Sequence, residues 1–333
     1  MKAVVVLIVT WTVLVPQILT RAQAAADRDS RVSVSYVPPK DPAHRAIYEQ
    51  LDQLRFLERL QRLLAPFRLP RALLVKLEGC DGDANAFYES NVITVCYEYI
   101  DQLWKTMPAQ TTAAGVTPAD AIVGPLFDTC LHEFAHALFE LLRVPVLGRE
   151  EDAADQVSAY IMLHLGKAEA RRLIGGVAYA YKTEADAATA PPTMTQFADV
   201  HGTPAQRFYN VLCIAYGADK QLFGDLVEKG YLPKERAEDC KDEYRQVAYA
   251  YEKLIGPHID RGRAKKMFDK SWLPTQRYRC RAGPARRNRN DALIRDQTAG
   301  SLASRSGRSA FRNIRAKWLG YASACFSKVC HVA

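Results

Sequence analysis

The pentapeptide His132-Glu133-Phe134-Ala135-His136 constrains this chain more than any other stretch. It lies in a helix-forming segment, residues 121–143, that is apolar on nearly every side of the motif. Because residues four apart on a helix share a face, His132 and His136 can bind one metal ion. Glu133 then lies beside the metal, where it can hold a water molecule and take its proton, and zinc lowers the pKa of that water to about 7. The alternative, a helix with two surface histidines, is disfavoured because a buried helix does not readily hold unpaired polar groups.

An acidic segment after a Pro/Gly turn offers the third ligand. It begins a second predicted helix, residues 150–165, in which Glu151 and Asp155 share a face. We predict that Glu151 is the third zinc ligand and that Asp155 accepts a hydrogen bond from the other ring nitrogen of His132, since a metal-bound histidine needs such an orienting partner. The alternative is an acidic cluster that only complements the helix dipole. If Glu151 is not the ligand, Glu150 is the next candidate.

The motif and its later carboxylates resemble a known group of enzymes. The pattern H-E-x-x-H followed by E-x-x-x-D resembles the gluzincin zinc metallopeptidases, the thermolysin-like clan. More closely, the strings HEFAHAL and GREEDAADQ, together with residues 199–216 and 236–240, resemble a bacterial family of secreted metallopeptidases of unassigned function. The family usually has Gly where this chain has Ala135, whereas thermolysin-like enzymes carry another residue there.

This resemblance covers approximately residues 33–260 and implies a fold. The expected architecture is α+β and zincin-like, with a small sheet packed on the motif helix and a helical lower lobe across a cleft. The sheet strands are expected over residues 31–37, 72–77 and 91–98. Helices are expected over residues 41–64, 100–107, 117–143, 150–165, 168–181, 207–216 and 236–255. We expect a break or kink at Gly124-Pro125, a weak point at Gly175-Gly176 and a loop over residues 182–195.

The resemblance also implies substrate-binding residues. The run that begins Asn85-Ala86 is similar to the segment before the edge strand in thermolysin-like enzymes, where backbone groups pair with an extended substrate, so both residues are expected to bind substrate. The alternative for Asn85 is a turn in which it satisfies its own backbone.

A second donor to the reacting carbonyl oxygen is expected from the helical lobe. Thermolysin-like enzymes use a histidine oriented by an aspartate, and His201 with Asp199 can fill these roles as catalytic residue and orienting partner. Arg207 is a further donor that can bind substrate. The alternative is a loop histidine beside a helix cap, because Thr203 starts a capping box.

Residues 1–26 have the features of a signal peptide. Lys2 precedes an apolar run over residues 3–15, and Ala22-Gln23-Ala24 is a small-residue cleavage site. An uncleaved membrane anchor is the alternative, but the apolar run is short for a bilayer. We therefore expect a secreted or periplasmic protein, in which disulfides are permissible.

The eight cysteines do not form a metal site, because no Cys-x-x-Cys pair occurs. Two pairings are favoured by their position along the chain, Cys80 with Cys96 and Cys213 with Cys240. Cys130 lies among apolar neighbours on the motif helix and is expected to be a buried free thiol.

The C-terminal segment, residues 281–333, differs from the rest in charge. It carries eleven of the 45 Lys and Arg residues but two of the 37 Asp and Glu residues, so the basic character of the chain belongs to it. We expect a metallopeptidase domain over residues 27–280 followed by a basic, unstructured tail. A weak contact of this tail with a membrane or the cell envelope is the alternative to a dispensable extension. No nucleic-acid partner is expected.

These observations favour an exported zinc-dependent metalloendopeptidase that acts on peptides or proteins. Two alternatives share the same ligands: an exported binding protein in which zinc has no catalytic role, and a zinc amidase that acts on cell-wall peptide.

Overall fold

The computed structural model describes residues 31–268, and in this range the protein is α+β with one four-stranded mixed sheet. The strands are β1 (Val32–Tyr36), β2 (Leu73–Glu78), β3 (Ala86–Glu89) and β4 (Val92–Cys96), in the spatial order β1-β2-β4-β3. β2 pairs in parallel with β1 and β4, whereas β3 runs antiparallel to β4. β3 is therefore an edge strand.

Alternation of apolar and polar residues explains β2, because Leu73, Val75 and Leu77 are buried while the residues between them are partly exposed. The three predicted strands are confirmed within one or two residues. The run that begins Asn85-Ala86 differs from expectation, because it forms the edge strand β3 itself instead of preceding it. Positive φ angles at Ser90 and Asn91 turn the chain from β3 into β4.

Helices make up most of the remaining chain. In chain order they are the short 3-10 helix η1 (Pro42–His44), α2 (Arg45–Gln53), α3 (Phe56–Leu64), α4 (Tyr97–Thr106), α5 (Asp120–Leu142), α6 (Glu150–Leu163), α7 (Lys167–Ala187), α8 (Met194–Phe197), α9 (Pro204–Ala218), α10 (Lys220–Phe223), α11 (Asp225–Glu228), α12 (Lys234–Leu254), the 3-10 helix η2 (Gly256–His258) and α13 (Arg261–Phe268).

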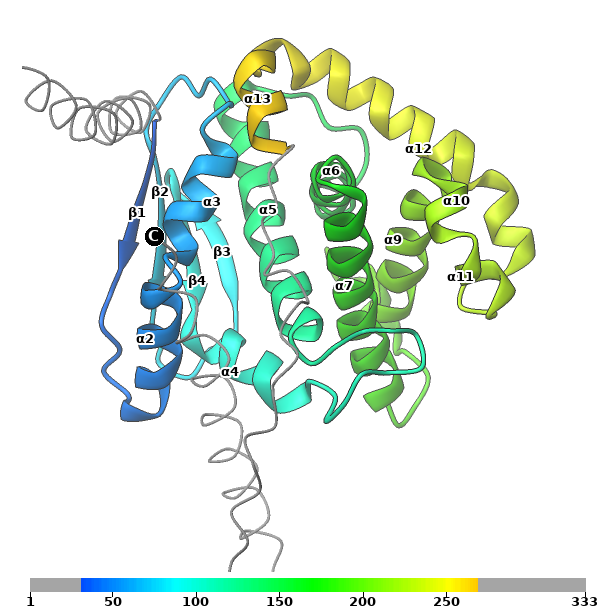
Figure 1. Ribbon diagram of the computed structural model, residues 1–333, viewed down its shortest axis with the longest axis horizontal. Helices are drawn as coiled ribbons and strands as arrows, with labels where there is room; N and C mark the ends of the chain where they lie inside the picture. The colour runs from blue at the N-terminus through cyan, green and yellow to red at the C-terminus, as the bar shows by residue number, and fades with distance from the viewer. Residues whose placement is uncertain (1–30, 269–333) are drawn as a thin grey trace, which may run out of the picture. The chain divides into compact units, whose positions relative to one another are not determined.

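The motif helix α5 lies between the sheet and the other long helices (Figure 1). Its sheet-side neighbours are β3 and β4, and on its other side it packs against α6 and α7. α9 packs in turn against α6, α7 and α12. Because α5 is enclosed from both sides, its residues are buried along nearly the whole length, as the apolar flanks of the motif predict.

Of the break or kink expected at Gly124-Pro125, the break does not occur, because α5 runs through Pro125 without interruption. At this point α5 crosses α7, and Gly124 packs against Gly176. A methyl group added to Gly176 would lie 2.0 Å from the carbonyl oxygen of Asp120, so the backbones touch at this point.

Two further expectations are wrong in detail. The helix expected over residues 41–64 is interrupted at Arg55, which adopts a left-handed conformation with φ of 50° and separates α2 from α3. The loop expected over residues 182–195 starts later, because α7 continues to Ala187. α7 is continuous through its two central glycines, of which Gly176 packs against α5 and Gly175 faces Val116.

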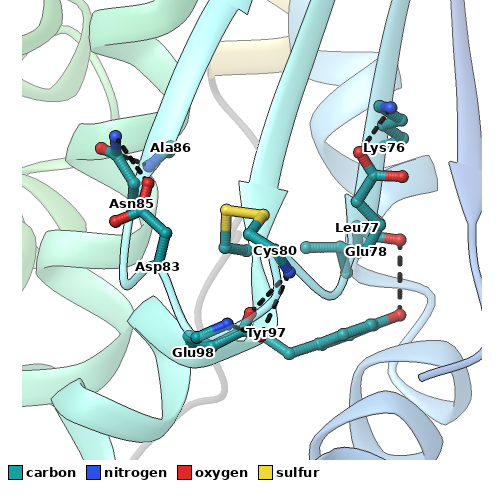
Figure 2. The surroundings of a disulfide bond; sticks show 11 residues. Lys76, Leu77, Glu78, Cys80, Asp83, Asn85, Ala86, Tyr97 and Glu98 are labelled. Atoms are coloured by element: carbon teal, nitrogen blue, oxygen red, sulfur yellow. Dashed lines mark hydrogen bonds and ion pairs between the residues drawn. A yellow bond between two sulfur atoms is a disulfide. The ribbon is translucent and has the colours of Figure 1, made fainter. Parts of the chain in front are cut away.

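Both expected disulfides are present. Cys80–Cys96 joins the loop after β2 to the end of β4, and Cys213–Cys240 joins α9 to α12. Figure 2 shows Glu98 beside the first disulfide, where its carboxylate accepts hydrogen bonds from the backbone N–H groups of Cys80 and Gly82. Cys130 is a buried free thiol, as expected.

The expected signal peptide and basic tail lie outside the described residues. Between residues 31 and 268, no helix combines the length and the apolar character needed to cross a bilayer.

Candidate functional site

The motif side chains His132, Glu133 and His136 all project from the middle of α5. His132 and Glu133 are 5% and 8% exposed, and His136 lies one turn later on the same face. The helix ends at Arg143, whose left-handed conformation turns the chain, and Gly148 at φ of 106° completes the turn into α6. This turn brings the first residues of α6 back beside the motif.

The ring nitrogens of the two histidines and one carboxylate oxygen converge. His132 Nε2 lies 3.0 Å from Glu151 Oε2 and 3.2 Å from His136 Nε2. The third side of this triangle, from His136 Nε2 to Glu151 Oε2, measures 3.3 Å. The expected third-ligand residue therefore lies with both imidazoles, and these three residues form one of the two potential metal-binding groups among the described residues. The other group includes the disulfide cysteines Cys80 and Cys96.

A carboxylate lies within hydrogen-bond distance of the other ring nitrogen, Nδ1, of each histidine. His132 Nδ1 lies 2.8 Å from Asp155 Oδ1, and His136 Nδ1 lies 2.7 Å from Glu150 Oε1. When each Nδ1 carries the ring proton and donates a hydrogen bond to its carboxylate, both Nε2 lone pairs face Glu151. Glu150 is therefore placed as an orienting partner of His136 and not at the point where the donors meet.

The donor set fits a zinc ion. Ligands about 2.0–2.1 Å from a tetrahedral zinc lie roughly 3.3 Å from one another, which is close to the three sides of the triangle. Two imidazoles and one carboxylate are the usual ligands of a catalytic zinc site, and carboxylate partners on the far ring nitrogens are typical of metal-bound histidines.

The charges around the triangle favour a cation. Burial alone lowers the pKa of His132, but hydrogen bonds to Asp155 and Glu151 outweigh it and raise the pKa to about 10. Hydrogen bonds from His132, His136 and His201 hold the pKa of Glu151 far below its usual range. A metal ion competes with the proton for the same ring nitrogen, so binding of metal releases protons from this site.

Glu133 lies next to His132 but belongs to no ion pair among the described side chains. Burial raises its pKa, while the two motif histidines act in the opposite direction. A buried carboxylate with a raised pKa is suited to accept and return a proton near neutral pH.

The segment before α9 brings a third histidine to the site. His201 Nε2 lies 2.8 Å from Glu151 Oε2, and its Nδ1 lies 3.4 Å from Asp199 Oδ1. The capping box at Thr203 and Gln206 starts α9 directly after this histidine, as predicted. The expected pair of His201 and Asp199 is thus found in contact, and its side chains are accessible, with 44% and 59% exposed.

Arg207 contacts Asp155 and does not point to the donor triangle. Its Nε and Nη2 donate to the two oxygens of Asp155 over 2.8 and 2.6 Å. Burial alone raises the pKa of Asp155, but hydrogen bonds from His132 and Arg207 lower it to about 2. Arg207 also lines the cleft described next, so its expected role in substrate binding stays a prediction.

A cleft of about 1520 Å³ opens above these residues. Its lining includes His132, Glu133, His136 and Glu151, and it also includes strand β3 with Asn85 just before it. Asn85 Oδ1 accepts a hydrogen bond from the backbone N–H of Ala86 over 2.9 Å, which agrees with the alternative of an asparagine that satisfies its own backbone. β4 covers one edge of β3, and the other edge is the one that an added strand could pair with.

Sequence reasoning missed two further polar residues that line the cleft, Asp128 and Tyr181. Asp128 lies one turn before His132 on α5 and is 6% exposed, and burial raises its pKa. The signal that could have found it is its spacing of four from His132, which puts both on one helix face.

The comparisons with known proteins identify one family. Residues 36–255 match a family, DUF4344, that is described as "Putative metallopeptidase". No curated protein and no solved structure matches the chain significantly.

Proposed function

Because the chain belongs to this metallopeptidase family, we propose that it is an exported zinc-dependent endopeptidase of the zincin-like, thermolysin-like type. The observation that carries the proposal is the convergence of His132 Nε2, His136 Nε2 and Glu151 Oε2 beside the buried Glu133 in an open cleft. The two disulfides are compatible with an extracellular or periplasmic location.

His132, His136 and Glu151 would hold the zinc ion. When bound, zinc supplies a Lewis acid that polarises a peptide carbonyl and lowers the pKa of a water molecule to about 7. Asp155 accepts a hydrogen bond from Nδ1 of His132, and Glu150 accepts one from Nδ1 of His136. These bonds would fix the orientation and the tautomer that each ring needs to bind zinc through Nε2.

Glu133 is the proposed general base and acid. Its carboxylate takes one proton from the attacking water and then delivers it to the nitrogen of the leaving amine, which balances the hydrolysis of one peptide bond. Its raised pKa, caused mainly by burial, supports this role because a strongly acidic carboxylate would be a poor proton acceptor.

His201 is the proposed donor to the oxygen that gains negative charge as the carbonyl is attacked. Its position beside Glu151 and its pairing with Asp199 support the role. Removal of one such donor slows comparable reactions by roughly 10²–10³-fold.

The substrate is proposed to be an extended peptide that adds to the free edge of β3. Main-chain hydrogen bonds along a strand edge give affinity without selecting particular side chains. Asn85 and Ala86 would bind its backbone at the start of the strand, and Arg207 is a further candidate contact.

A Glu133→Gln variant tests the proposal against the reading in which zinc is only structural. We expect this variant to keep the zinc content of the wild type and to cleave an unbiased peptide library at least ~10²-fold more slowly. Glu235→Gln, which changes an exposed carboxylate on α12, is the matched control and should cleave normally. Wild-type protein that holds zinc and cleaves no peptide would contradict the endopeptidase proposal and favour a binding protein or a cell-wall amidase.

A further inference from the structure

A second layer of polar contacts lies behind the candidate metal ligands, and it links four helices. We infer that Tyr181 and Asp128 are positioning residues for the metal centre, which hold Arg207 so that Asp155 stays directed at His132. The inference rests on the proposed metal site and extends it to two residues outside the three candidate ligands, both of which also line the cleft.

The first link joins Asp155 to both of its partners. Asp155 Oδ1 lies 2.8 Å from His132 Nδ1 and 2.6 Å from Arg207 Nη2, while Arg207 Nε donates to Oδ2 over 2.8 Å. The two guanidinium bonds fix the plane of the carboxylate, because a planar fork matches both oxygens at once. The orientation of Arg207 therefore decides how well Asp155 can accept from His132.

The second link is the aromatic ring under Arg207. The guanidinium carbon lies 4.5 Å from the centre of the Tyr181 ring, a distance at which a cation is attracted to the ring face. Tyr181 comes from α7 and Arg207 from α9, so this contact joins two helices that carry none of the metal ligands. A shift of the ring would shift the guanidinium with it.

The third link fixes the ring itself. The Tyr181 hydroxyl donates to Asp128 Oδ2 over 3.1 Å, and the Ser158 hydroxyl donates to Asp128 Oδ1 over 2.6 Å. Asp128 and Ser158 are both buried. Burial and the charge of Asp155 raise the pKa of Asp128, while the charges of Arg207 and His132 lower it, with a net rise. Asp128 is engaged by two neutral hydroxyls, one from α6 and one from α7.

The contacts form a closed ring. On α5, Asp128 and His132 are four residues apart, and on α6, Asp155 and Ser158 are three apart, so each pair shares a helix face. α5 and α6 are joined by two neighbouring bonds, His132 to Asp155 and Asp128 to Ser158. α7 and α9 close the ring through Tyr181 and Arg207. Buried networks of this kind are rigid when every member is satisfied, and they loosen when one member is lost.

Zinc affinity is the readout that separates positioning from a purely structural role. Loss of a partner that orients a metal-bound histidine typically weakens metal affinity by 10–100-fold. We expect Tyr181→Phe, which removes only the hydroxyl, to weaken zinc binding by about 10-fold, and Tyr181→Leu, which also removes the ring, by up to about 100-fold. Affinity is measured by competition with a chromophoric chelator.

Tyr179→Phe is the matched control, since its hydroxyl on the same helix donates to the carbonyl oxygen of Thr106 outside the ring. It should bind zinc like the wild type. Asp128→Asn is a second test from the opposite end of the hydrogen bond and should resemble Tyr181→Phe. Circular dichroism and thermal unfolding verify that each variant is folded. If the Asp128 variant does not fold, the zinc affinity of Tyr181→Phe alone tests the inference.

Wild-type zinc affinity in folded Tyr181→Phe and Tyr181→Leu would overturn the inference. A raised KM with unchanged zinc affinity would also overturn it, because Tyr181 would then contact substrate. Because zinc affinity is measured without peptide cleavage, it tests the positioning inference separately from the endopeptidase proposal. If the wild type binds zinc but cleaves no peptide, the endopeptidase proposal fails while the positioning inference is still decided by affinity.

Discussion

Glu151 Oε2 lies 3.0 Å from His132 Nε2, although the two residues are 19 positions apart and belong to different helices. The adjacent carboxylate, Glu150, instead reaches Nδ1 of the other motif histidine. Two neighbouring glutamates at the start of α6 thus contact opposite sides of two imidazoles. Because Glu151 lies at the Nε2 atoms and Glu150 lies at Nδ1, Glu151 is the candidate ligand and Glu150 is the candidate orienting residue.

The first prediction uses this pair of glutamates. We expect Glu151→Ala to lose zinc on dialysis, because it removes one of three donors, whereas Glu150→Ala should retain zinc with an affinity lowered by about 10-fold. Metal analysis of both variants after dialysis against a weak chelator makes the comparison. Equal zinc content in Glu151→Ala and wild type would remove Glu151 from the ligand set.

The second prediction concerns the crossing of α5 and α7. Gly176→Ala would place a methyl group 2.0 Å from the carbonyl oxygen of Asp120, so the helices would have to separate. We expect a loss of roughly 1–3 kcal/mol in the free energy of unfolding, measured by urea denaturation.

Gly175→Ala is the control for this change, since its methyl group would meet Val116 Cγ2 at an ordinary 3.5 Å. This variant should be unchanged or more stable by up to about 1 kcal/mol, because alanine favours a helix over glycine. Equal stability of the two variants would argue against a close crossing.

The third prediction is a pH dependence of stability at Glu98. Burial alone raises the pKa of Glu98, but hydrogen bonds from the backbone N–H groups of Cys80 and Gly82 outweigh it and lower the pKa below its ordinary 4.5. A lowered folded-state pKa means that the ionised form stabilises the fold above pH 4.5, and that this stabilisation is lost as the pH falls through the folded-state value.

Glu98→Gln should therefore lower the thermal unfolding temperature at pH 7, and its difference from wild type should shrink as the pH falls below about 4. Glu238→Gln, at an exposed position on α12, controls for the change in net charge. A difference that is constant from pH 7 to pH 3 would mean that ionisation of Glu98 does not contribute.

The fourth prediction concerns the disulfide between α9 and α12. Cys213 and Cys240 close a loop of 27 residues, and the chain-entropy model assigns such a link roughly 3–4 kcal/mol of stability. The double variant Cys213→Ala, Cys240→Ala should lose about this amount in chemical denaturation. A peptide map without reductant checks that Cys80–Cys96 is intact in the variant, and an unchanged unfolding free energy would contradict the prediction.

Much of the local structure could be predicted because its causes lie within a few residues. The alternation of β2, the capping box at Thr203 and Gln206, and the apolar surroundings of the motif each depend on neighbours along the chain. Both disulfides agree with the favoured pairings, Cys80–Cys96 because these cysteines bracket a turn and a strand, and Cys213–Cys240 because they lie on neighbouring helices.

One error arises from contact between segments distant in sequence. A Gly-Pro pair predicts a break in α5, but Gly124 packs on Gly176, some 50 residues away, and α5 stays continuous. The unbroken apolar stripe over residues 41–64 likewise predicts one helix, whereas the chain turns at Arg55.

The sequence by itself determined which residues are able to share a helix face, because the spacing of four in His132 and His136, and in Glu151 and Asp155, is a property of any helix. Only the tertiary structure decided which carboxylate faces which nitrogen, and that Tyr181 contacts both Arg207 and Asp128 beside the site. The physical reason is that helical periodicity is set by local backbone geometry, whereas a contact between helices depends on the packing of every segment between them.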